Sequence, residues 1–138
     1  MVDENLIKEI KEMREKGAGE PSDALKLIEF MKQLAEENED LKEELEDVDL
    51  VAQFEFSDVG YKYWVKMGDG KIEYGEGENP DATVTMSATA AIWGQLGSGE
   101  LDSTSAYMSG DLKIEGNLQD AIAYGEIMSM AMDEFPED

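Results

Sequence analysis

A turn and a strand meet in residues 77–87, which read GENPDATVTMS. The Gly, Asn, Pro and Asp of the first half are residues that favour turns. In the second half, Ala82, Val84 and Met86 alternate with three hydroxyl-bearing residues, and this period of two predicts a half-buried strand. We expect the apolar side of this strand to lie on a hydrophobic core.

Before this strand, alternation predicts three further strands in succession. The first carries Phe54 and Phe56 on one side, the second covers residues 59–67, and the third covers residues 71–74. The links between them are short, and the turn at 68–70 reads Gly-Asp-Gly. Sequential strands joined by tight turns predict an antiparallel meander.

After residue 87, helical and strand patterns alternate. We expect a helix capped by Ser87 or Thr89 that runs to Leu96, a short helical turn at 103–108, a strand at 112–115 and a last helix at 118–135. The last helix has a wide apolar arc, which is typical of a helix that contacts several neighbours. These elements predict an α+β fold: a five-stranded, mainly antiparallel sheet covered by helices.

Residues 1–49 predict a helical extension in front of a core module at 50–138. Between residues 24 and 48 a heptad pattern places apolar residues at a and d positions, with Asn38 at an a position. A coiled coil would make the chain a homodimer, and a helix that folds back on its own domain is the alternative. The residues that would pair two chains are Leu27, Leu34, Asn38, Leu41 and Leu45.

Composition excludes several classes of function. The 138 residues hold 11 basic and 34 acidic side chains, a net charge of −23, which opposes binding to nucleic acid. The sequence has no Cys and no His, so thiol nucleophiles, His-dependent triads and thiolate or imidazole metal sites are excluded. We therefore expect no enzyme activity and no cofactor.

Two further absences concern metals and membranes. Acidic residues gather around the loops at 69–81, but without the ligand spacing of an EF-hand, so a solvated loop is favoured over a metal site. The start of the chain shows no secretory signal, and no apolar run approaches the length that spans a bilayer. We expect a cytoplasmic protein without stable membrane insertion.

Aromatic residues and methionines gather on elements that should face one another. Such side chains suit an apolar ligand of variable shape, although they can also simply fill a core. The candidate ligand-binding residues are Phe56, Trp64, Val84, Met86, Trp93, Leu96, Met108, Ile114, Ile122, Gly125, Met128 and Met132.

Three motifs in order carry a resemblance to the sterol carrier protein type 2 family. They are GDGK at 68–71, the stretch 77–87 quoted above, and SGDLKIEGN at 109–117, which leads into the last helix. With the hairpin at 54–67, the similarity covers about residues 48–135. The resemblance implies a five-stranded sheet covered by helices, with a hydrophobic tunnel between them that holds fatty acyl chains, acyl-CoA, sterols or other lipids.

The resemblance implies non-enzymatic binding or transfer of an apolar lipid, such as a fatty acyl, sterol-like or isoprenoid molecule, in a tunnel between the sheet and the last helix. The alternative is a scaffolding or accessory module that dimerises and assists an enzyme of lipid or isoprenoid metabolism without carrying lipid. The volume left by the methionines separates these two hypotheses.

Overall fold

The computed structural model describes residues 3–16, 21–98 and 101–135. Its helices and strands follow one another as α1 (Glu4–Lys16), a 3₁₀ turn (Pro21–Asp23), α2 (Ala24–Glu37), α3 (Glu39–Glu46), β1 (Asp49–Phe56), β2 (Tyr61–Gly68), β3 (Lys71–Glu76), β4 (Val84–Ala88), α4 (Ala90–Ser98), α5 (Ser103–Ser109), β5 (Lys113–Gly116) and α6 (Leu118–Asp133).

The strands form one five-stranded sheet in the order β3-β2-β1-β4-β5. Pairs β1·β2, β2·β3 and β4·β5 are antiparallel, and the central pair β1·β4 is parallel. The prediction of a five-stranded, mainly antiparallel sheet with N-terminal helices is confirmed. The parallel pair arises because the chain leaves β3, passes through the loop at 77–83 and returns beside β1.

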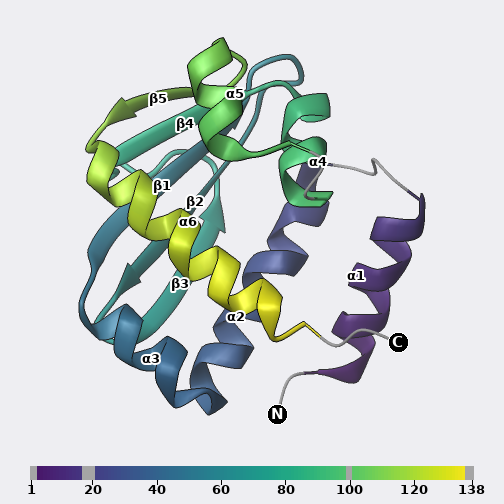
Figure 1. Ribbon diagram of the computed structural model, residues 1–138, viewed down its shortest axis with the longest axis vertical. Coiled ribbons are helices and arrows are strands. Elements are labelled where there is room, and N and C mark those ends of the chain that lie inside the picture. The colour runs from purple at the N-terminus through teal and green to yellow at the C-terminus, as the bar shows by residue number, and fades with distance from the viewer. Residues whose placement is uncertain (1–2, 17–20, 99–100, 136–138) are drawn as a thin grey trace.

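One side of the sheet faces the helices. The alternation along each strand sends every second side chain toward them, and Figure 1 shows α6 lying across the strands with α2 beside it. We call this side the helix-covered face and the other side the polar face. The buried side chains of the helix-covered face are Leu50, Ala52, Phe54, Phe56, Tyr63, Val65, Met67, Ile72, Val84, Met86 and Ala88.

Helices α2 and α3 share this core with the sheet. Phe30 and Met31 of α2 and Leu45 of α3 are buried in the same hydrophobic cluster as the strands. The rings of Phe30 and Phe135 meet edge to face at 5.1 Å, which joins α2 to the end of the chain segment that contains α6. The Tyr74 hydroxyl donates to Glu29 Oε1 at 2.5 Å, and burial together with this hydrogen bond raises the pKa of Tyr74 to about 12.

The heptad pattern at 24–48 is not a continuous helix. Asn38 has extended backbone dihedrals (φ −103°, ψ 109°) and separates α2 from α3, and its side-chain oxygen accepts the Leu41 backbone N–H at 3.0 Å. The predicted a-position Asn is therefore a helix N-cap. The leucines at 34, 41 and 45 are buried in the chain's own core, and Leu27 packs against it. The prediction of a coiled coil through these residues is wrong, and the fold-back alternative is the one observed.

Replacing Asn38 by Leu distinguishes these two roles. In a coiled coil, removing a polar a-position residue would raise stability. As an N-cap, its loss is expected to lower the free energy of unfolding by about 1 kcal/mol. Chemical denaturation measures the change. The matched control is Asn38→Asp, which keeps a cap acceptor and is expected to change stability by less. A more stable Leu variant would contradict the capping role.

Candidate functional site

An aromatic cluster lies at the centre of the helix-covered face. Phe54 of β1 stacks on Tyr63 of β2, with centroids 4.8 Å apart and planes 11° from parallel. The same ring meets Trp93 of α4 edge to face at 5.5 Å and Tyr124 of α6 at 5.0 Å. Offset and edge contacts of this kind are favourable beyond the area they bury. Phe54 therefore connects the sheet to both helices that cover this part of it.

Helix α4 is held near the end of β1 by two hydrogen bonds, and a third caps its own first turn. The Trp93 indole N–H donates to the Glu55 carbonyl at 2.9 Å, and the Ala90 backbone N–H donates to Asp58 Oδ1 at 2.9 Å. Thr89 Oγ1 accepts the Ile92 N–H at 3.3 Å, which confirms Thr89 as a cap. Trp93 thus fixes α4 to the sheet both by its indole hydrogen bond and by its ring contact with Phe54.

Helix α6 is positioned by the turn between β5 and its first residue. The Asn117 backbone N–H donates to the Thr83 carbonyl at 2.9 Å, and Asn117 Oδ1 accepts the Asp120 N–H at 3.2 Å. From this start, the residues that α6 buries are Ala121, Tyr124, Ile127 and Ala131. Their spacing of three and four places them on one side of the helix.

The interior beneath α6 is apolar and uncharged. Burial raises the pKa of the Tyr63 and Tyr124 hydroxyls, and the proximity of Tyr61 to the first and of Tyr63 to the second adds to each shift, so both stay protonated at neutral pH. The Tyr124 hydroxyl has no hydrogen-bond partner among the described residues. This interior suits apolar groups, with one neutral hydroxyl that is free to make a hydrogen bond.

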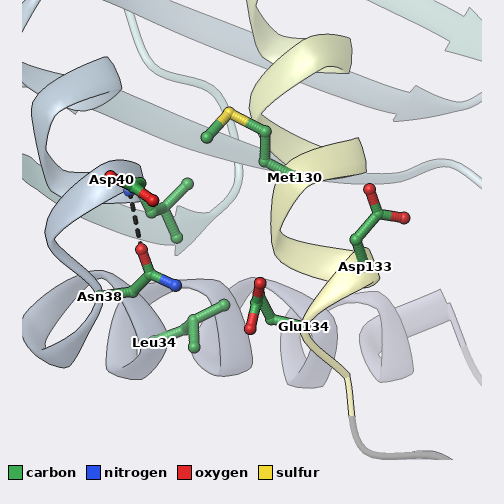
Figure 2. A pocket seen from close by; sticks show the side chains of 7 residues that line it. Leu34, Asn38, Asp40, Met130, Asp133 and Glu134 are labelled. Atoms are coloured by element: carbon green, nitrogen blue, oxygen red, sulfur yellow. Dashed lines mark hydrogen bonds between the residues drawn. The ribbon is translucent and has the colours of Figure 1, made fainter.

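Two pockets accompany this core, and neither lies between the sheet and the middle of α6. The first, about 160 Å³, lies where α6 ends near the junction of α2 and α3, and Figure 2 shows Asn38 and Glu134 among its lining side chains. The second, about 380 Å³, lies on the polar face beside the loop at 78–82. The first is smaller than ordinary ligand sites. Neither of these two pockets lies at the place predicted for the tunnel.

Most of the predicted ligand-binding residues lie in the hydrophobic core or pack against it. Five lie inside the core or pack on it from the sheet and α4, and two methionines of α6 pack against its edge. Leu96 of α4 also packs against the core. The residues brought together are Phe56, Val84, Met86, Trp93, Ile114, Leu96, Met128 and Met132.

Four predicted residues lie elsewhere. Trp64 is on the polar face, because it alternates with the buried Tyr63 and Val65, and its indole lies over Gly75. Met108 of α5 is 80% exposed and Ile122 of α6 is 47% exposed. Gly125 is also exposed, and a side chain added there would meet nothing within 4 Å. The buried side of α6 is turned away from Ile122 and Gly125 because Tyr124 and Ile127 occupy it.

The candidate set omits Phe54, Tyr63, Tyr124 and Ile127, which form the centre of the site. Phe54 and Tyr63 share the strand faces of predicted core residues, so the alternation itself could have found them. Tyr124 and Ile127 lie in the same spacing of three and four as Ala121 and Ala131, which marks the buried side. The wide apolar arc of α6 concealed this narrower pattern.

The polar face carries hydrogen bonds and ion pairs. Gln53 is buried there, and its amide donates to the carbonyls of Tyr63 (3.1 Å) and Gly77 (2.9 Å) and accepts the Asn79 N–H (2.8 Å). These bonds fasten the 77–79 loop to β1 and β2. The Lys62 ammonium lies 2.5 Å from Glu78 Oε1, and this hydrogen bond and charge raise the pKa of Lys62 and lower that of Glu78.

Metal-binding and membrane-spanning features are absent from the described ranges. Within residues 3–16, 21–98 and 101–135, no group of three Asp or Glu side chains is arranged to hold a metal ion. Over the same ranges, no helix combines the length and apolar character needed to cross a bilayer.

The structure combines a mixed five-stranded sheet, helices over one face and an apolar, aromatic interior between them. Comparison with protein families matches residues 31–129 to the SCP-2 sterol transfer family. The chain belongs to this family. The match begins at residue 31, within α2, so it includes the second half of α2 and all of α3 as well as the sheet.

Individual relatives agree with this assignment. Hydroxysteroid dehydrogenase-like protein 2 of Bos taurus is 39% identical over 82 residues, which cover 57% of this chain and 19% of that protein. The chain therefore spans about a fifth of the length of this relative. Sterol carrier protein 2 of Yarrowia lipolytica has the same fold, with a TM-score of 0.61 at 18% identity, over 75% of this chain and 88% of that one.

A third similar structure is described as the UbiJ-SCP2 ubiquinone synthesis protein. It matches with a TM-score of 0.53 at 15% identity, over 92% of this chain and 96% of that one. At these identities the two structures show a shared fold, which extends over nearly the whole chain.

Proposed function

We propose that the chain binds the apolar part of a lipid between α6 and the sheet, around Phe54, and that it makes or breaks no bond. Membership of a sterol transfer family supports binding or transfer of a lipid. The aromatic cluster is the observation that supports this position for the lipid. Side chains of β1, β2, α4 and α6 meet there without a charged group among them.

Binding at this place requires α6 or α4 to yield space. Met128 and Met132 are half-buried at the edge of the core, and methionine side chains adapt their shape more readily than branched ones. Helix α4 contacts the cluster through Trp93, so a change in the conformation of this side chain would alter how α4 covers the cluster. A lipid chain would enter by displacing these side chains rather than by filling an existing tunnel.

The free energy of binding would come from removing the lipid from water. Each buried methylene contributes about 0.8 kcal/mol, so a chain of eight to ten methylenes contributes roughly 6–8 kcal/mol before the loss of its freedom on binding is subtracted. The net charge of −23 favours neutral or cationic lipids over anionic ones.

Replacing Met128 by Trp tests this position. The larger side chain would fill the edge of the core where the lipid should enter, and we expect uptake of N-phenyl-1-naphthylamine, a neutral fluorescent apolar probe, to fall at least about tenfold. Fluorescence titration measures the affinity. The matched control is Met108→Trp, which makes the same change at a side chain that is 80% exposed and should leave uptake unchanged. Unchanged uptake in a folded Met128 variant would remove this site.

The second candidate is an accessory module that assists an enzyme of lipid metabolism without carrying lipid. The close aromatic packing beneath α6 favours it, as do the exposed apolar side chains of Tyr107 and Met108 on α5 and Leu118 and Ile122 on α6. Native mass spectrometry of the purified protein separates the candidates. A bound lipid supports the first, whereas an empty protein that also fails to take up the neutral probe supports the second.

A further inference from the structure

The Tyr124 hydroxyl is a buried polar group that the protein leaves without a partner. The residue is 6% exposed, its ring lies 5.0 Å from that of Phe54, and its hydroxyl oxygen makes no hydrogen bond within the described chain. Buried polar side-chain atoms are nearly always hydrogen-bonded in folded proteins. Among the side chains that the structure describes, this hydroxyl is the one such exception.

The hydroxyl adds nothing to the ring contacts of Tyr124. Phenylalanine would give the same ring contacts with Phe54 and would remove the unfavourable burial of an unpaired donor. Gln53, the buried amide on the polar face, has a partner at both of its side-chain polar atoms through three bonds. The Tyr124 hydroxyl beneath α6 has no partner among the described residues.

The surroundings of the hydroxyl select an uncharged partner. Phe54 and Tyr63 stack on each other beside it, and Trp93 meets Phe54 from α4. No Lys whose side chain the structure describes is buried, so a carboxylate or phosphate placed here would have no counter-charge. A hydroxyl or carbonyl group can pair with a tyrosine hydroxyl without bringing a charge into the core.

We propose that the Tyr124 hydroxyl binds the polar group of the lipid, and that the ligand is an uncharged amphiphile with a hydroxyl or carbonyl group. This inference rests on the proposed function. With this hydrogen bond, the polar group of the ligand lies deep beneath α6, next to Phe54, while the hydrocarbon part extends toward the edge formed by Met128 and Met132.

The experiment compares two ligands with two proteins. Dodecan-1-ol and dodecane have the same hydrocarbon chain and differ in one hydroxyl, and each is delivered from β-cyclodextrin to displace N-phenyl-1-naphthylamine. For the native protein we expect dodecan-1-ol to bind more tightly. In Tyr124→Phe we expect the affinity for dodecan-1-ol to fall about tenfold and that for dodecane to stay within about twofold, because only the alcohol loses a hydrogen bond.

The controls separate the outcomes. Tyr107→Phe removes a hydroxyl from a side chain that is 43% exposed and should leave both affinities unchanged. Equal effects of Tyr124→Phe on both ligands, or no effect on either, would overturn the role of Tyr124 while leaving lipid binding intact. If the native protein bound neither ligand nor the neutral probe, the proposed function itself would fail. The phenylalanine variant keeps every ring contact, so loss of folding would contradict this account of Tyr124 as an unpaired hydroxyl.

Discussion

Replacing Phe54 by Ala is expected to lower the free energy of unfolding by about 3–5 kcal/mol. The side chain is 2% exposed and its ring contacts Tyr63, Trp93 and Tyr124, so the substitution leaves a cavity and removes three aromatic pairs at once. Domains of this size have only about 5–15 kcal/mol of total stability. Chemical denaturation followed by circular dichroism measures the change.

The matched control for this prediction is Tyr107→Ala. It also removes an aromatic ring, but from a side chain that is 43% exposed on α5, so its effect should be within about 0.5 kcal/mol. A loss of less than about 1.5 kcal/mol in Phe54→Ala would show that the cluster is loosely packed. That result would contradict the close contact of α4 and α6 with the centre of the sheet.

Replacing Gly116 by Ala should have an effect of similar size for a different reason. Gly116 has a φ of +96°, and a β-carbon there would lie 2.6 Å from the Thr83 carbonyl oxygen and 3.1 Å from the Val84 α-carbon. Both neighbours are backbone atoms of the adjoining strand, so the contact is relieved only by moving β5 and the start of α6. We expect a loss of about 3–5 kcal/mol, from backbone strain and overpacking together.

Gly77→Ala isolates the steric part of this effect. Gly77 has nearly the same φ, +91°, but a β-carbon there would meet no atom within 4 Å. Its substitution should therefore cost about 1–2 kcal/mol, from the backbone conformation alone. Thermal and chemical denaturation of both variants give the difference. Equal losses in the two variants would mean that the close approach of Gly116 to β4 contributes nothing to stability.

Much of the fold follows from local patterns. The alternation around Phe54, Val65 and Met86 predicts which side of each strand is buried, and the structure confirms it. Of the two predicted caps, Ser87 and Thr89, the structure confirms Thr89, and the turn at 68–70 ends one strand and begins the next. These features depend on neighbouring residues, so they can be inferred without knowing what the chain packs against.

The incorrect prediction of a coiled coil came from a sequence pattern that fits two different packing arrangements. A repeat of apolar residues every three and four positions buries a helix equally well against a second chain or against a sheet. Asn38 looks the same in either case until its backbone is known, because Asn favours both a coiled-coil a position and an N-cap. Only the tertiary contacts of Leu34 and Leu41 distinguish the two.

The sequence predicts which faces of the strands line the candidate site, but it does not identify several of the individual residues at its centre. Trp64 is one of the predicted aromatic candidates, although alternation with Tyr63 assigns it to the polar face. The wide apolar arc predicted for the last helix does not single out Tyr124, although its spacing with Ala121, Ile127 and Ala131 places it on the buried side of α6. An unpaired buried hydroxyl has no signature in the sequence, because it depends on which groups the fold brings near it.

The parallel pairing of β1 with β4 at the middle of the sheet bears on how the chain folds. The meander of β1, β2 and β3 forms from neighbouring residues, whereas Ala52 reaches its partner Val84 only after the chain between them has closed a long loop. Contacts between distant residues slow folding because the entropy of loop closure is lost before they form. We therefore expect β4, β5 and α6 to join a meander that is already formed, so that the helix-covered face is completed in the last stage of folding.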